Sequence, residues 1–236
     1  MDLNYFINIE TSTDICSVSL SRNAETIALK ENHERNHASA VARYIEDILI
    51  ENKLNVSDLS GVAISKGPGS YTGLRIGTST AKGMAYQSGI KLIAVDTLQA
   101  MALKAAQSPS LLPHPTDTII CSTLDAGRNE VYSELFDLNN NVLRPTQAEL
   151  ITTESYAEYF ANHHVLFVGN AAAKISGIIS NNKAAFATDI TPSADYMAQI
   201  TYNQFVNQDF ADVAYFEPFY LKDFIAVISN KNVLKK

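Results

Sequence analysis

The amino-acid sequence predicts an α/β protein in which one unit is duplicated, giving two lobes with a cleft between them. The same order of elements (strand, polar elbow, strand, extended stretch, helix, strand, helix) occurs twice in the 236 residues. Three prolines between residues 108 and 118 disfavour regular structure and separate the halves. Apolar residues make up 46%, enough for a buried core. We expect lobes at 1–107 and 119–236, joined by 108–118, with the last segment free to pack back on the first lobe.

The first half is predicted to open with a β-meander and a helix. Asn36 is a favourable helix cap, and apolar residues between 38 and 49 recur on one helical face after it. A Gly-Pro-Gly loop separates a short buried strand from a second helix, and Asp96 caps a third helix. The predicted strands are 5–9, 15–20, 26–29, 61–65 and 91–95, and the first two helices are 36–52 and 73–87.

The second half repeats this order after the proline segment. A polar elbow at 125–129 follows its first strand, and a turn at 139–141 follows its second. Thr191 and Pro192 are predicted to start the last long helix. The predicted strands are 119–124, 130–137 and 165–168, and the predicted helices are 153–162, 171–180 and the one that starts at 191.

Charge and cysteine content limit the functional class. Lys and Arg number 18 against 25 Asp and Glu, a formal charge of −7, so non-specific nucleic-acid binding by this chain alone is disfavoured. Cys16 and Cys121 are too few for a disulfide scaffold, and we expect buried thiols in a reducing compartment. The sequence lacks a signal peptide and any run of about 18 apolar residues, so we expect a cytoplasmic protein without a membrane segment. Lys231, Lys235 and Lys236 are predicted to form a solvated end.

The segment 65–83 places a glycine-rich loop between a strand and a helix, as phosphate-binding proteins do. Its spacing excludes three standard mechanisms. Five residues separate Gly67 from Gly73, and Leu-Arg follows where a P-loop has Lys-Ser or Lys-Thr. The spacing of Gly67, Gly69 and Gly73 is one residue longer than in the dinucleotide-binding pattern Gly-x-Gly-x-x-Gly. Tyr71 stands where a nucleophile elbow needs serine.

Small residues form a stripe along the second predicted helix. Gly73, Gly77, Ala81 and Ala85 are spaced at i+4, and a glycine inside a helix costs about 1 kcal/mol relative to alanine. The stripe therefore predicts a close approach. Packing on the lobe's own sheet and packing against a helix of a partner explain it equally well from the residues alone.

Two further patterns are candidates for chemistry. His33, Glu34 and His37 match a metalloprotease spacing, but the Asn36 cap places His33 outside the helix that such a site requires. The two polar elbows are expected to face each other, and in nucleotide-binding proteins of this architecture such elbows hold phosphates and a metal-bound water. Neither elbow is rich in glycine, so they are equally explained as turns of the fold. The candidate residues for a vestigial phosphate site are Glu10, Thr11, Ser12, Asp125 and Gly127.

Six segments together resemble the bacterial TsaB family, formerly called YeaZ. The part from 67 to 83 is highly specific, and the other segments extend the resemblance over nearly the whole chain. The segments are 8–13 (Asn-Ile-Glu-Thr-Ser-Thr), 36–38 (Asn-His-Ala), 65–83, 95–98 (Val-Asp-Thr-Leu), 125–132 (Asp-Ala-Gly-Arg-Asn-Glu-Val-Tyr) and 218–221 (Pro-Phe-Tyr-Leu).

The resemblance implies a duplicated actin-like (ASKHA, ribonuclease H-like) fold. It also implies a role in making threonylcarbamoyladenosine next to the anticodon of tRNAs that read codons starting with A. In this family TsaD, a paralogue of the same fold, catalyses the transfer; TsaB is its obligate partner, and the ATPase TsaE joins them. The resemblance further implies a homodimer when TsaD is absent and tRNA contact only through the complex. No cofactor is expected in this chain alone, and ATP or ADP and a metal ion are expected in the partner subunits.

Comparison with TsaD indicates that the chain is not itself an enzyme. TsaD carries a His-Met-Glu-Gly-His metal site after the strand that corresponds to 91–95, where this chain has Thr-Leu-Gln-Ala-Met. Thr97 and Met101 replace the two histidines, and neither substitutes for imidazole as a strong ligand. We therefore expect a non-catalytic scaffold or activator of TsaD. The alternative is an active ATPase or small-molecule kinase of the same fold, which would need phosphate-binding elbows.

The family's partner surface uses the first two helices, which here favours a partner interface for the small-residue stripe. On this interpretation Gly77→Leu is expected to leave the chain folded and to weaken TsaD binding. The predicted partner-binding residues are His37, Val41, Ile45, Gly73, Arg75, Gly77, Thr80, Ala81 and Met84.

Overall fold

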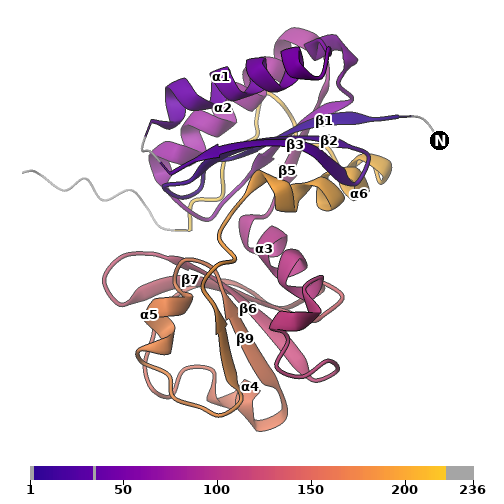
Figure 1. Cartoon of the computed structure of the whole chain (residues 1–236). Helices are drawn as coiled ribbons and strands as arrows, with labels where there is room; N and C mark the ends of the chain where they lie inside the picture. The colour runs from indigo at the N-terminus through magenta and orange to yellow at the C-terminus, as the bar shows by residue number, and fades with distance from the viewer. Residues whose placement is uncertain (1–2, 34–35, 222–236) are drawn as a thin grey trace, which may run out of the picture.

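The computed structural model describes residues 3–33 and 36–221 and shows two lobes, each built on a five-stranded sheet (Figure 1). In each sheet three strands form an antiparallel meander and the other two add in parallel, so the strand order of the first lobe recurs in the second. The predicted duplicated α/β fold is confirmed. The first sheet, in the order β3-β2-β1-β4-β5, contains β1 (Tyr5–Glu10), β2 (Cys16–Arg22), β3 (Glu25–Asn32), β4 (Gly61–Ser65) and β5 (Lys91–Val95). The second, in the order β10-β9-β6-β7-β8, contains β6 (Thr118–Asp125), β7 (Glu130–Phe136), β8 (Val142–Leu150), β9 (His164–Val168) and β10 (Ala184–Ala187).

Helices cover both faces of the first sheet (Figure 1). α1 (His37–Glu51) and α2 (Tyr71–Ser88) lie side by side on one face, and the turn η3 (Ala194–Met197) with α6 (Ala198–Val206) lies on the other. The alternation of β2 explains this arrangement, because its apolar residues face α1 while its serines face η3. Ser17 Oγ accepts the N–H of Ala194 at 2.8 Å, and the Ser19 hydroxyl donates to its carbonyl at 2.8 Å.

The chain crosses between the lobes earlier than predicted. α3 (Thr97–Ala106), assigned to the first lobe by the boundary at 107, packs on the second sheet through Leu98, Met101, Ala102 and Ala105. Asp96 caps α3 as expected, accepting the N–H groups of residues 98 and 99 at 2.9 and 3.1 Å. The chain then returns, since η3 and α6 pack on the first sheet against Phe6 and Ile93.

Several elements differ from the sequence expectation. The proline segment contains a 3-10 turn, η2 (Pro109–Leu111), and another, η1 (Val56–Asp58), follows α1. β8 and β10 were not predicted. The last helix starts only at Ala198, because η3 occupies its predicted first turn. The helices α4 (Ala157–Asn162) and α5 (Ala172–Ser176) are shorter than predicted.

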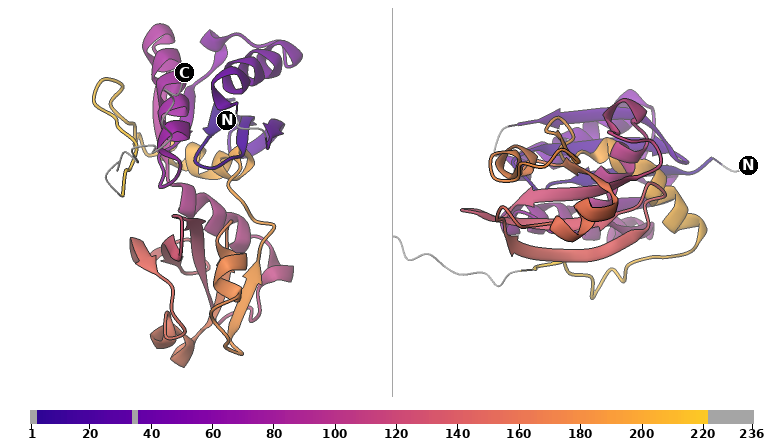
Figure 2. Two further views of the ribbon diagram at one scale, coloured as in Figure 1. Left: turned by 90° about the vertical axis from the view of Figure 1, so that its left-hand side faces the viewer. Right: turned by 90° about the horizontal axis from the view of Figure 1, so that it is seen from below.

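After α6, residues 207–221 run without helix or strand from the β5 edge of the first sheet to the side of α2 (Figure 2). The N–H of Ala211 donates to the carbonyl of Leu92 at 2.9 Å, and Lys82 of α2 donates to the carbonyls of Ala214 and Phe216 at 3.1 and 3.0 Å. We call residues 207–221 the C-terminal segment. The predicted solvated end at 231–236 lies outside the described residues. Over the described part of the chain, no helix is long and apolar enough to span a membrane.

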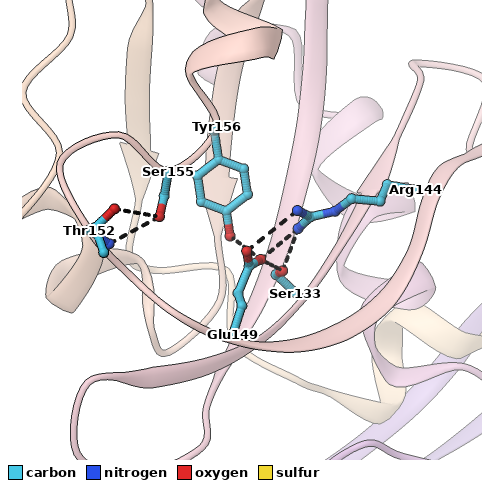
Figure 3. A network of polar contacts seen from close by, with 6 residues as sticks. All are labelled: Ser133, Arg144, Glu149, Thr152, Ser155 and Tyr156. Carbon is cyan, nitrogen blue, oxygen red and sulfur yellow. Dashed lines mark hydrogen bonds and ion pairs between the residues drawn. The ribbon is translucent and has the colours of Figure 1, made fainter.

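A polar network holds β8 and the loop after it to the second sheet (Figure 3). The Glu149 carboxylate accepts hydrogen bonds from the Ser133 hydroxyl, from Arg144 at 2.6 Å and from the Tyr156 hydroxyl at 2.8 Å. Burial alone would raise the pKa of Glu149, but these hydrogen bonds outweigh it and lower the pKa. The network therefore stabilises a charged carboxylate at the outer edge of the second lobe.

Candidate functional site

A cleft of about 540 Å³, lined by polar and apolar residues, lies between the lobes. The first elbow lines it with residues 12–15, and the second elbow lines it with residues 124–126. Gly69 and Ser70, from the loop before α2, also line it, together with Tyr132, Asn170, Thr191 and Pro192. The elbows therefore face each other across one cleft, although Glu10, Thr11 and Gly127 are not part of its lining.

The first elbow turns its carboxylate inward. Glu10 is 1% exposed at the end of β1, and its Oε1 accepts the N–H of Ser12 at 2.5 Å. Burial is the largest influence on Glu10 and raises the pKa of its carboxyl group. Thr11 and Ser12 are equally buried, so this elbow presents little of its predicted phosphate-binding set to the cleft.

The carboxylate of the second elbow is held by a backbone N–H group of the elbow and by a lysine of α5. The Asp125 carboxylate accepts the N–H of Gly127 at 2.7 Å and pairs with the Lys174 ammonium at 2.5 Å. Partial burial acts to raise the pKa of Asp125, but the contacts with Lys174 and Gly127 outweigh it and lower the pKa. The Asp125 N–H in turn donates to Asn170 Oδ1 at 2.9 Å.

These contacts disfavour phosphate chemistry in the cleft. The Ser12 and Gly127 N–H groups already donate to carboxylates of the chain. Asp14 and Asp125 line the cleft, and no Lys, Arg or His is among its described lining residues. A phosphate would therefore meet two carboxylates, of which Asp125 is paired with Lys174, and no cationic side chain in the lining itself. The arrangement favours turns of the fold over the ATPase or kinase alternative.

The two positions that the resemblance aligns with the TsaD histidines are buried. Thr97 and Met101 lie in α3 and are 1% and 0% exposed, and Met101 packs against the second sheet. His37 starts α1 and its Nε2 lies 2.7 Å from the Thr13 carbonyl, while His33 precedes the helix. Asn36 occupies the N-cap position as predicted, but its side chain makes no capping hydrogen bond. Within residues 3–33 and 36–221, no three His, Cys, Asp or Glu side chains are grouped to hold a metal ion.

The small-residue stripe of α2 packs on the lobe's own sheet. A Cβ on Gly77 would collide with Thr11 Oγ1 and lie 2.7 Å from Ile64 Cδ1, and a Cβ on Gly73 would collide with the Thr11 carbonyl. Ala81 is 0% exposed. The expectation that Gly77→Leu leaves the chain folded is therefore wrong, because a larger side chain has no room there.

The structure divides the nine predicted partner-binding residues into two groups. Arg75 is exposed, and Thr80 and Met84 are half-buried. Six others are buried, which corrects their assignment to an exposed contact surface, although His37 and Gly73 line a hollow beside it. These six are His37, Val41, Ile45, Gly73, Gly77 and Ala81.

The two helices nevertheless present a joint surface to solvent, which we call the outer face. Gly83 lies on it, and an added Cβ there would meet no atom within 4 Å. The sequence analysis missed Gly83 because this residue lies outside the i+4 stripe of small residues. A glycine that lies inside a helix but outside the stripe could have indicated a second close approach. A 330 Å³ hollow lined by Thr13, His37 and Thr72 adjoins the outer face at the helix N-termini. The outer face comprises the exposed residues Ala38, Ser39, Ala42, Arg43, Glu46 and Ile50 of α1 and Thr72, Arg75, Ser79, Gly83, Tyr86 and Gln87 of α2.

Known proteins are similar to this chain over most of its length. The protein named tRNA threonylcarbamoyladenosine biosynthesis protein TsaB of Haemophilus influenzae is 26% identical, covering 91% of this chain and 92% of the relative. The protein of the same name from Escherichia coli (strain K12) is 28% identical, covering 92% and 94%. The solved structure of YeaZ from Pseudomonas aeruginosa superposes with a TM-score of 0.77 at 20% identity, covering 92% of this chain and all of that one, which shows the shared fold.

The resemblance to TsaB predicted from the motifs is thus confirmed, together with the actin-like fold that it implies. A family model described as TsaD, tRNA N6-adenosine threonylcarbamoyltransferase, matches residues 28–229. Because this match spans most of the sequence, the chain belongs to that family.

Proposed function

We propose that this chain is a non-catalytic subunit of the tRNA threonylcarbamoylation machinery and that it binds TsaD through the outer face of α1 and α2. Its relatives named TsaB are biosynthesis proteins of threonylcarbamoyladenosine, and they match it nearly end to end. The buried Thr97 and Met101, where TsaD carries histidines, support a role other than catalysis. The chain would hold TsaD in its active arrangement.

The observation that carries the proposal is the open position at Gly83. A glycine inside a helix costs about 1 kcal/mol relative to alanine, and nothing within this lobe requires its small size. Ser79 lies one turn before it on α2, and Ala38 and Ala42 are exposed on α1. A helix of another chain could approach this face closely, because small residues let helix backbones come together.

The remaining parts of the proposal follow from the same assignment. TsaE joins the complex, tRNA is contacted mainly through partners because this chain carries a charge of −7, and ATP or ADP and a metal ion belong to the partner subunits. Without TsaD, the outer face would pair with the same face of a second copy. The site of action would be the cytoplasm, where tRNA is modified.

Substitution of Gly83 by leucine tests the proposal. The added side chain projects into open space, so the melting temperature should be unchanged or higher, while the affinity for the TsaD of the same organism should fall at least about tenfold. Ala161→Leu, at an exposed helix position of the second lobe, is the matched control and should bind like wild type. Unchanged TsaD affinity of folded Gly83→Leu would contradict the assignment of the outer face.

A further inference from the structure

Three side chains stack at the N-terminal end of α2. The Arg75 guanidinium lies over the Tyr71 ring, 4.1 Å from its centroid. Tyr71 also contacts Tyr220 of the C-terminal segment, whose ring centroid is 4.9 Å away at an interplanar angle of 45°. Tyr220 thus helps to orient the exposed Arg75 guanidinium, although the two residues are 145 positions apart in the chain.

The backbone fixes the C-terminal segment at this point. The N–H of Phe219 donates to the Lys66 carbonyl at 2.7 Å, and the Phe219 carbonyl lies against Gly67, where a Cβ would be 3.0 Å away. Lys82 anchors the segment upstream through two carbonyls. The structure therefore joins the 65–83 and 218–221 segments and places Tyr220 beside α2.

The stack gives Arg75 the chemistry of an anion receptor. A guanidinium lying on an aromatic ring keeps its N–H edge available and loses less conformational entropy when it binds. Arg75 is exposed and forms no ion pair with a described residue. Its planar fork matches a carboxylate or a phosphate with two parallel hydrogen bonds.

We propose that Arg75, oriented by Tyr71 and Tyr220, receives a carboxylate of the protein that docks on the outer face. The inference rests on the proposed function, since Arg75 belongs to that face. A protein carboxylate is favoured over an RNA phosphate because the chain as a whole is acidic, which disfavours a polyanion. Tyr220 acts through Arg75 and is a positioning residue.

The test is titration calorimetry of nucleic-acid-free chain against TsaD at low and high salt. Arg75→Ala should weaken binding about tenfold or more, and Arg75→Lys should weaken it less, because lysine keeps the charge but not the fork. In a chain that keeps Arg75, Tyr220→Ala should weaken TsaD binding about threefold. Tyr220→Phe retains the aromatic ring and should bind TsaD normally. In an Arg75→Ala background, Tyr220→Ala should add nothing. Arg22→Ala, at the far end of β2, is the matched control.

The outcomes separate the two levels of the argument. Failure of the wild-type chain to bind TsaD would overturn the proposed function and, with it, this inference. Normal binding by wild type and by Arg75→Ala would overturn the inference alone. If Arg75→Ala bound TsaD normally but weakened binding of tRNA by the complex, the ligand would be a phosphate and the carboxylate assignment would be wrong. Additive effects of Arg75→Ala and Tyr220→Ala would overturn the positioning role of Tyr220.

Discussion

Two glycines of α2 should respond in opposite directions to the same substitution. Gly77 faces the sheet and Gly83 faces solvent, although both lie inside one helix six residues apart. Replacement by alanine adds one methyl group at each position and increases helix propensity equally. The difference between the two variants therefore measures the space around each Cβ.

The structure sets the size of the two effects. At Gly83 the methyl group meets nothing within 4 Å, so the variant should gain the full propensity difference of about 1 kcal/mol. At Gly77 it collides with the Thr11 hydroxyl and lies 2.7 Å from Ile64 Cδ1. Overpacking of this kind costs about 1–3 kcal/mol, which exceeds the propensity gain over most of that range. The net effect is a loss of up to about 2 kcal/mol, so we expect Gly77→Ala to be about 1 kcal/mol less stable than wild type.

Thermal unfolding followed by circular dichroism gives the answer directly. For a chain of this length, 1 kcal/mol corresponds to about 2–4 °C, so Gly83→Ala should melt a few degrees above wild type and Gly77→Ala a few degrees below. Equal melting temperatures for the two variants would refute the placement of α2 on the first sheet. A stabilised Gly77→Ala would refute it as well.

Two further substitutions test the second lobe. Burial, with the nearby Asp96 carboxylate second, raises the pKa of Glu134 from 4.5 to about 7. Its contribution to stability is therefore complete below about pH 4.5 and is lost as the pH rises through 7. Glu134→Gln can still accept the hydrogen bond of the Thr146 hydroxyl. In urea unfolding, this variant should be up to about 3 kcal/mol more stable than wild type at pH 8 and nearly as stable as wild type at pH 4.5. A difference in stability that does not change with pH would contradict this. Tyr156→Phe removes a hydrogen bond to the charged Glu149 and should cost about 1.5–3 kcal/mol while TsaD affinity stays at the wild-type value; loss of affinity would place the network of Figure 3 in the partner surface.

The elements with a clear local signal could be predicted from the sequence. β5 and β9 are short apolar runs, and their bounds match the predicted strands to within one residue. Asp96 is an effective cap because its carboxylate reaches two N–H groups of α3. By contrast, β8 is an edge strand interrupted by Pro145, with most of its residues exposed or half-buried, so its pattern shows no apolar run.

Features that depend on distant parts of the chain could not be predicted. Whether the Gly77 side of α2 faces the sheet or a partner depends on where Thr11 and Ile64 lie, and helical periodicity is the same in both cases. The packing of α3 on the second sheet and the contact between Tyr71 and Tyr220 likewise depend on the crossing of the chain between lobes. The sequence therefore predicts which residues line one helical face and leaves open what that face contacts.

The most direct test of the central claim is nucleoside mass spectrometry of bulk tRNA from cells depleted of this chain. Depletion should remove threonylcarbamoyladenosine. Wild type should restore it, and so should Glu10→Gln, which preserves the inward acceptor of the first elbow without its charge. Folded Gly83→Leu should restore less of it than wild type, because its affinity for TsaD is reduced. Unchanged modification after depletion would contradict the pathway assignment. Restoration by wild type but not by folded Glu10→Gln would favour a working nucleotide site. Full restoration by Gly83→Leu would contradict the outer face as the TsaD-binding surface.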